Sequence, residues 1–136
     1  MKRSYLLDTG PAYDFLFQRA GIRERMYALQ RTGAKFGIGL PTLGEIIAGL
    51  EGSTSRKESW VIVHRSLGRL IRWPFDDPAA YEYGRLFADL RKRGRVIQQV
   101  DIQLAAITLT KKECVLVTYD SDFSVITGLP FENWLA

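Results

Sequence analysis

The sequence predicts an α/β protein of three layers, α/β/α, built on a short and mostly parallel central sheet. One observation is that short aliphatic or β-branched runs alternate with longer segments whose apolar residues recur at helical spacing. A second is the run at residues 114–118, which is apolar without alternation and is typical of a parallel strand covered on both faces. A third is that acidic residues follow several of these runs, at the edge where α/β proteins commonly place their chemistry.

The composition is that of one globular domain, which we expect to span residues 1–136. Hydrophobic residues make up 46% and charged residues 25%, a profile that excludes a disordered or membrane-embedded chain. No apolar run approaches the ~18 residues that a membrane-spanning helix needs, and the N-terminus lacks a signal-peptide pattern. We therefore expect a cytoplasmic protein with no membrane partner.

The chain has one cysteine and one histidine, which limits the possible sites. Cys114 lies inside an apolar run, which indicates buried packing and excludes an intrachain disulfide or a cysteine-rich zinc site. His64 has no second histidine or cysteine near it in the sequence, so a histidine-based triad or zinc protease site is not expected.

The net charge is +4, from 19 basic and 15 acidic residues, and the basic residues are clustered. They gather at residues 19–31, 65–72 and 91–95. A single cluster is usually a solvated helix face, but three clusters around an acidic centre indicate a polyanionic substrate such as nucleic acid.

The N-terminal quarter is expected to form a strand and two helices. Residues 4–7 read as a short strand that ends at Asp8. Gly10 permits a sharp turn, and Pro11 suits the first position of the helix that follows. A second helix is expected at residues 22–32. Asp8 itself is explained equally well as the cap of the first helix.

A second strand is expected at residues 36–40, stopped by Pro41. Thr42 and Glu45 have the spacing of a capping box, in which Thr42 would be the N-cap of the next helix. Periodicity alone therefore favours Glu45 as a capping or solvent-exposed residue. Its position just after a strand nevertheless places it at the same edge of the sheet as Asp8.

The middle of the chain predicts a polar loop at residues 52–59, a helix, and a short strand at residues 71–75. Asp77 as N-cap followed by Pro78 then begins another helix, so Asp76 and Asp77 are left out of the candidate site. The expected buried stripe of that helix is Ala80, Tyr83, Phe87 and Leu90.

The last third contains the most informative stretch. Asp101 opens a helix that is apolar on nearly every side and is therefore expected to be buried. The strand at residues 114–118 follows, with Tyr119, Asp120 and Asp122 just beyond its end. A short helix and an edge strand around residues 130–132 are expected to complete the sheet.

The acids at strand ends and helix starts are expected to share one pocket, because carboxyl ends of parallel strands meet at one edge. These acids are Asp8, Glu45, Asp101 and Asp120 or Asp122. Carboxylates buried together repel one another, and a hard divalent cation relieves that repulsion. The pattern therefore predicts a metal site.

With these motifs in this order, the chain resembles PIN domains, and more narrowly the VapC-type toxins of toxin–antitoxin pairs. The matching segments are residues 6–9, 43–51, 74–76, 93–95, 100–106, 116–123 and 132–135. The family commonly has asparagine where this chain has Gly10 and Tyr119.

The resemblance implies an endoribonuclease that hydrolyses RNA phosphodiester bonds with Mg²⁺ or Mn²⁺. The catalytic acids that it implies are Asp8, Glu45, Asp101 and Asp122. Of these, the implied metal ligands are Asp8, Asp101 and Asp122. Supporting roles would be taken by Thr9, Thr118 and Asp120. A cognate VapB-type antitoxin and a homodimer are also implied.

Two other classes remain open. A haloacid-dehalogenase-like phosphatase would carry Asp-x-Asp in the first strand, but Gly10 stands two residues after Asp8, and a response-regulator receiver would need paired acids that are missing. A PIN-like module that binds RNA or a protein without cutting is the second class. RNA cleavage with Mn²⁺ that is abolished by EDTA separates the enzyme from the binding module, and hydrolysis of a small phosphate ester would favour the phosphatase.

Overall fold

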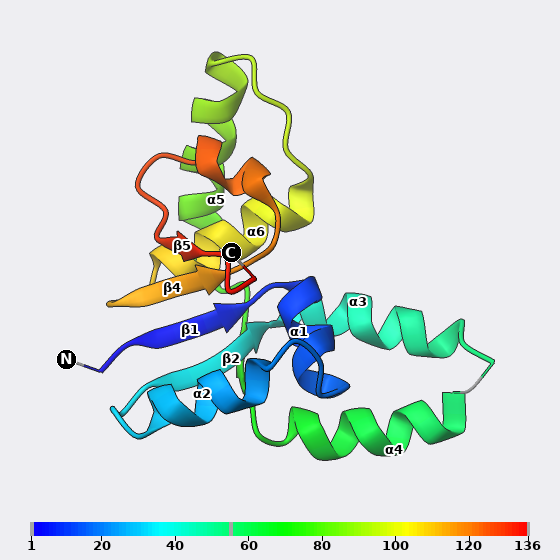
Figure 1. Cartoon of the computed structure of the whole chain (residues 1–136). Coiled ribbons are helices and arrows are strands. Elements are labelled where there is room, and N and C mark those ends of the chain that lie inside the picture. The colour runs from blue at the N-terminus through cyan, green and yellow to red at the C-terminus, as the bar shows by residue number, and fades with distance from the viewer. Residues whose placement is uncertain (1, 55, 136) are drawn as a thin grey trace.

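The computed structural model describes residues 2–54 and 56–135 and contains a five-stranded parallel sheet (Figure 1). The strands in chain order are β1 (Ser4–Leu7), β2 (Lys35–Gly39), β3 (Ile71–Trp73), β4 (Cys114–Val117) and β5 (Phe131–Glu132). Their order across the sheet is β3-β2-β1-β4-β5, so β1 lies at the centre. Helices cover both faces, which confirms the predicted three-layer α/β/α fold.

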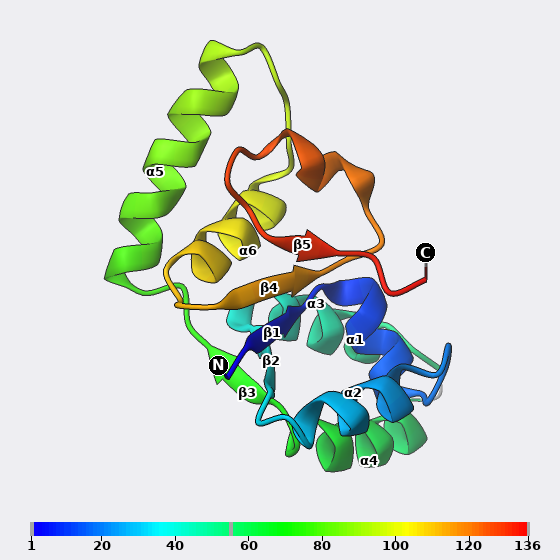
Figure 2. The same ribbon diagram turned by 60° about the vertical axis from the view of Figure 1, so that its left-hand side comes forward.

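In the part of the chain that the structure describes, four α-helices pack against one face of the sheet, and two α-helices and a short 3-10 helix pack against the other (Figure 2). The first four are α1 (Thr9–Leu16), α2 (Ile22–Gln30), α3 (Leu40–Glu51) and α4 (Arg56–Leu67). On the opposite face lie α5 (Asp77–Lys92), α6 (Gln99–Leu109) and the short 3-10 helix η1 (Ser121–Val125). None of the helices in the described residues is long and apolar enough to cross a membrane.

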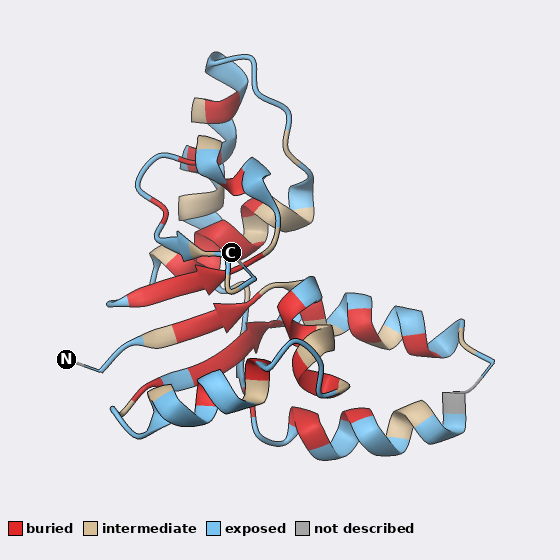
Figure 3. Ribbon diagram, in the orientation of Figure 1, coloured by how far each residue is buried: buried red, intermediate tan, exposed pale blue. Residues whose placement is uncertain are grey.

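The alternation of side chains along β1 explains why the chain has two hydrophobic cores. Tyr5 and Leu7 belong to the core beneath α1 to α4, whereas Leu6 belongs to the core beneath α5 and α6. All four residues of β4 are buried, as the continuous apolar run predicts. Figure 3 shows the same pattern, with the central strands buried and the edges of the molecule exposed.

The capping-box prediction for Thr42 is wrong. Strand β2 ends at Gly39, which is the N-cap of α3, and the helix begins at Leu40, so Pro41 lies in the first turn of the helix and is not the residue that stops the strand. Thr42 is consequently inside the helix and fully buried. Its Oγ1 has no hydrogen-bond partner among the described residues.

The predicted N-cap of α5 is displaced by one residue, and the predicted buried face is correct for two of its four residues. Asp76, not Asp77, is the N-cap, and its carboxylate accepts a hydrogen bond from the Ala79 amide at 3.1 Å. Leu90 is buried and Tyr83 packs against the core, as predicted. Ala79 is buried where Ala80 was expected, and Leu86 is buried where Phe87, which is 45% exposed, was expected. Neighbouring helical residues point about 100° apart, so an error of one residue places Ala80 and Phe87 off the buried face.

The predicted loop at residues 52–59 is shorter than expected, because α4 begins at Arg56. The one residue of that loop that lies outside the described part of the chain is Ser55. The remaining elements agree with the sequence to within a few residues, including the edge strand β5.

Gly37→Ala is expected to lower the unfolding free energy by about 1–3 kcal/mol, because it overpacks the contact between β2 and β3. A Cβ at Gly37 would lie 2.5 Å from the Ile71 carbonyl oxygen and 2.7 Å from the Trp73 ring. Gly84→Ala is the matched control, since a Cβ there meets nothing within 4 Å and lies within α5. Thermal unfolding should show a lower Tm for Gly37→Ala and an equal or higher Tm for the control.

Candidate active site at the carboxyl edge of the sheet

Asp8 stands where β1 ends and α1 begins, and both of its carboxylate oxygens are held. Oδ1 accepts a hydrogen bond from the Thr9 backbone amide at 2.8 Å, which makes Asp8 the N-cap of α1. Oδ2 accepts a hydrogen bond from the Thr118 hydroxyl, also at 2.8 Å. Asp8 is thus both the cap of α1 and a link to the end of the neighbouring strand. Its capping role is therefore compatible with a place in the candidate site.

Thr118 joins the ends of β1 and β4. Its side chain is 1% exposed, donates to Asp8 and accepts a hydrogen bond from the Asp120 amide at 3.1 Å. Asp120 in turn accepts from the Asp122 amide at 2.8 Å and is the N-cap of η1. The turn after β4 is therefore organised by a series of local hydrogen bonds that leads to Asp8.

Glu45 lies in α3 and reaches the same edge through Thr9. The Thr9 hydroxyl donates a hydrogen bond to Glu45 Oε1 at 3.0 Å. Glu45 is exposed, as periodicity alone indicated, but it does not cap its own helix. This contact across the sequence connects the second acidic motif to the first.

Asp101 lies in the first turn of α6 and is electrostatically coupled to the other acids. Burial raises the pKa of its carboxyl from 3.8 to about 6, and the nearby negative charges add to that rise. The contributing carboxylates are Asp8, Asp120, Glu45 and Asp122. The pKa of Asp8 is also raised, mainly by burial, although the Thr9 and Thr118 hydrogen bonds oppose this.

The structure brings the predicted acids to one edge but does not close them into a coordination shell. Among residues 2–54 and 56–135, no three acidic, histidine or cysteine side chains are arranged closely enough to hold a metal ion. Within that same part of the chain, none of the five acids forms an ion pair with lysine or arginine. The assignment of catalytic acids and metal ligands therefore stays a prediction.

A groove beside Asp122 supplies basic and apolar surface. Its volume is about 350 Å³, and its lining residues are Gly94, Arg95, Val96, Ile97, Asp122 and Val125. Arg93 is not free to join this lining, because it bonds to Asp89 and to the Val125 carbonyl oxygen at 2.7 Å. The loop after α5 is thereby anchored with Arg95 next to a candidate acid.

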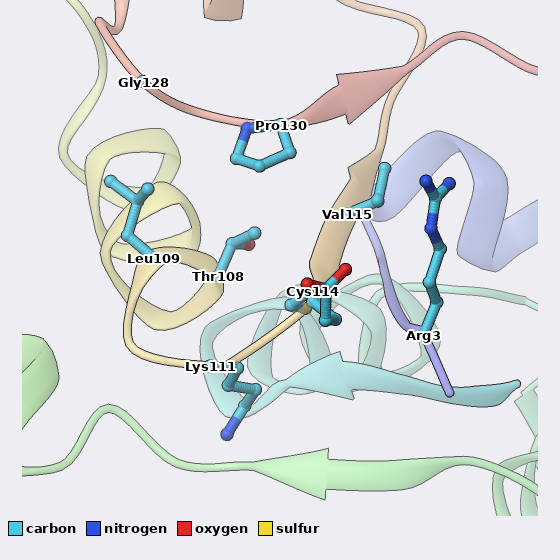
Figure 4. Close-up of a pocket in the computed structure, with 9 residues that line it drawn as sticks. Arg3, Thr108, Leu109, Lys111, Cys114, Val115, Gly128 and Pro130 are labelled. Atoms are coloured by element: carbon cyan, nitrogen blue, oxygen red, sulfur yellow. The ribbon is translucent and has the colours of Figure 1, made fainter. Parts of the chain in front are cut away.

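A second cavity, of about 280 Å³, lies at the opposite edge of the sheet (Figure 4). Arg3 precedes β1, and Cys114 and Val115 begin β4, so this cavity is at the amino ends of the strands. None of the five acids of the candidate site lines this cavity; these acids are Asp8, Glu45, Asp101, Asp120 and Asp122. Burial raises the pKa of the Cys114 thiol to about 11, which fits the predicted packing role.

Sequence reasoning did not identify Asp14 as a neighbour of the site. Asp14 lies within α1, accepts a hydrogen bond from the Tyr119 hydroxyl at 2.7 Å and pairs with Arg19 at 3.3 Å. A side chain at Gly10 would also meet the Tyr119 ring. The only signal in the sequence was that Gly10 and Tyr119 both depart from the asparagines that the resembling family commonly has.

Comparison with known proteins gives relatives along nearly the whole chain, although no family model matches it. The tRNA(fMet)-specific endonuclease VapC of Shigella flexneri is 25% identical over 131 residues, which cover 96% of this chain and 97% of that protein. Ribonuclease VapC2 of Haemophilus influenzae is 24% identical over 131 residues, covering 96% of this chain and 98% of its own.

Solved structures give the same result. VapBC2 from Rickettsia felis, bound to a DNA fragment from its promoter, contains a chain with a TM-score of 0.89 and 22% identity, and the match covers 96% of this chain and 98% of that one. For DNA-bound VapBC from Salmonella typhimurium the TM-score is 0.85 and the identity 27%, with 97% and 98% covered. The chain is therefore similar to VapC proteins along nearly its whole sequence and shares their fold, in agreement with the resemblance seen in its motifs.

Proposed function

We propose that this chain is a divalent-metal-dependent endoribonuclease and the toxin of a VapBC-type toxin–antitoxin pair. Relatives that match it from end to end are named ribonuclease or endonuclease, which supports the nuclease activity. The observation that carries the proposal is electrostatic. Burial raises the pKa of Asp101, and four carboxylates from three other segments of the chain raise it further. Among the described residues, no lysine or arginine forms an ion pair with any of these acids.

The donor set fits Mg²⁺ or Mn²⁺, because every candidate ligand is a hard oxygen. Asp8, Asp101 and Asp122 would hold the ion, and Glu45 would be a ligand or position the attacking water. A bound divalent ion lowers the pKa of a water molecule and offsets negative charge on the leaving 3′ oxygen. No protein nucleophile is needed for this chemistry.

The remaining polar residues would orient the acids. Thr118 donates to Asp8 Oδ2, which fixes one carboxylate plane while leaving the oxygens' other lone pairs available. Thr9 acts in the same way on Glu45. Asp120 is occupied by the Asp122 amide and would hold the fourth acid in place more than contact the ion.

RNA would reach the acids along the groove that contains Arg95. The Arg95 side chain is exposed in the same groove as Asp122, so its guanidinium is available to a phosphate oxygen. Exposed Arg91 extends the basic surface along α5. Positive charge at the mouth of an acidic site would offset the repulsion between the carboxylates and the RNA backbone.

The proposed protein partners are a VapB-type antitoxin and a second copy of this chain. The antitoxin is supported by solved structures of relatives, which are VapBC complexes. In the cell the proposed location is the cytoplasm, where both RNA and the antitoxin would be available.

A cleavage assay tests the function directly. The purified chain should cut single-stranded RNA in the presence of Mn²⁺ or Mg²⁺, lose that activity when EDTA is added, and leave a small phosphate ester intact. Co-purification with a VapB-type antitoxin should suppress cleavage. RNA that is bound but never cut would identify a binding module instead, and rapid hydrolysis of the phosphate ester would identify a phosphatase.

A further inference from the structure

Tyr119 stands between two residues of the candidate site, Thr118 and Asp120, but its side chain is directed to α1. The Cδ2 and Cε2 atoms of its ring lie 2.9 and 3.3 Å from the point where a Cβ on Gly10 would be. Its hydroxyl donates a hydrogen bond to Asp14 Oδ2 at 2.7 Å. The side chain therefore crosses from the turn after β4 to the first two turns of α1.

Filling of a hydrophobic core does not explain this placement. Tyr119 is half-buried, and it is not among the residues that form or pack against either of the two cores. Its hydroxyl is bonded to a carboxylate that also pairs with Arg19, at 3.3 Å. Burial and Asp14 raise the pKa of the Tyr119 hydroxyl, so it stays protonated as a donor at neutral pH.

Helix α1 is thereby attached to the turn after β4 at two points, its N-cap and its second turn. The first is the hydrogen bond from Thr118 to Asp8, the N-cap of α1. The second is the hydrogen bond from Tyr119 to Asp14. Two separated attachments prevent rotation of the helix about a single contact, which would change the direction of Asp8 and of Thr9.

We propose that Tyr119 is a positioning residue for the candidate active site, and that Gly10 is required beside it because its lack of a Cβ admits the tyrosine ring. Together they hold the turn at residues 118–122 against α1, and so fix the positions of Thr118, Asp8 and Asp120 relative to one another. This inference rests on the proposed nuclease function. It gives Gly10 and Tyr119 a shared role at the two positions where the family that the chain resembles commonly has asparagine.

Tyr119→Phe is the central test, because it removes the hydroxyl and keeps the ring. In the metal-free protein, hydrogen exchange of the Asp120 and Asp122 amides should become several-fold faster, since these amides donate within the turn. The Kd for Mn²⁺, measured by titration without RNA, should rise about tenfold. In cleavage assays kcat should fall by a similar factor while KM changes little.

Tyr81→Phe is the matched control, because Tyr81 is 84% exposed on α5 and lies outside the site. It should change none of these quantities. Thermal unfolding of every variant verifies that the measurements are made on folded protein.

The requirement for Gly10 is tested by a double-mutant cycle. Gly10→Ala should displace the ring and weaken Mn²⁺ binding about tenfold, as should Tyr119→Ser. The double variant should lose no more Mn²⁺ affinity than Tyr119→Ser alone, because removal of the ring also removes its clash with the Cβ of Ala at position 10. If the two losses of Mn²⁺ affinity multiply in the double variant, the proposed dependence of Tyr119 on Gly10 is wrong.

The outcomes separate this inference from the proposed function. A wild-type chain that neither binds Mn²⁺ nor cuts RNA refutes the function, and the positioning role with it. A wild-type chain that does both, beside a Tyr119→Phe variant with unchanged Mn²⁺ affinity and kcat, refutes the positioning role alone.

Discussion

Asp101→Asn should lower the rate of RNA cleavage by at least about a hundredfold while the chain stays folded. Asparagine keeps the size of the side chain but removes a negative charge that interacts with the other four acids of the candidate site. If Asp101 binds the divalent ion, the variant loses both a ligand oxygen's charge and the ion's affinity for the site. A single-turnover cleavage assay at saturating Mn²⁺ measures the effect on the chemical step.

Asp77→Asn is the appropriate control for that experiment. Asp77 is exposed in the first turn of α5, and it is an aspartate at a helix start just as Asp101 is. The control variant should cleave RNA at the wild-type rate. Full activity in Asp101→Asn, or equal losses in both variants, would contradict the assignment of Asp101 to the catalytic centre.

The sheet was predictable because its strands carry strong local signals. β4 is apolar on both faces, and β1 is followed directly by Asp8 and then, two and three residues later, by Gly10 and Pro11. The first turn of α3 was harder, since Pro41 is compatible with both the end of a strand and the start of a helix. Tertiary packing decided in favour of the helix and buried Thr42 inside it.

The sequence predicted which acids lie at the candidate site, but it did not predict the hydrogen bonds between their side chains and the surrounding residues. Asp8 and Asp120 follow adjacent parallel strands, so topology alone brings them to one edge. The hydrogen bond between Tyr119 and Asp14 joins residues 105 positions apart. No periodicity or spacing encodes such a contact, because it depends on how α1 lies across the end of β4.

The metal-free protein should lose stability as the pH rises through about 6, and Asp101→Asn should remove much of that loss. The pKa of Asp101 is raised from 3.8 to about 6 in the folded chain. Between these values the folded chain keeps a proton that the unfolded chain has released, so the unfolding free energy falls as the pH rises. The stabilisation is complete below about pH 4 and is lost above about pH 6.

Thermal unfolding in a chelator, at about pH 3.5 and about pH 7.5, tests this linkage. Wild-type protein and Asp101→Asn should have similar Tm values at the lower pH, where a protonated aspartic acid resembles asparagine. At the higher pH the variant should be the more stable, because it lacks a charge that is half-buried among Asp8, Asp120 and Glu45. Since other carboxylates titrate in both proteins, the difference between the two Tm values isolates Asp101. A difference that does not change with pH would show that burial and the neighbouring acids do not raise the pKa of Asp101 in solution.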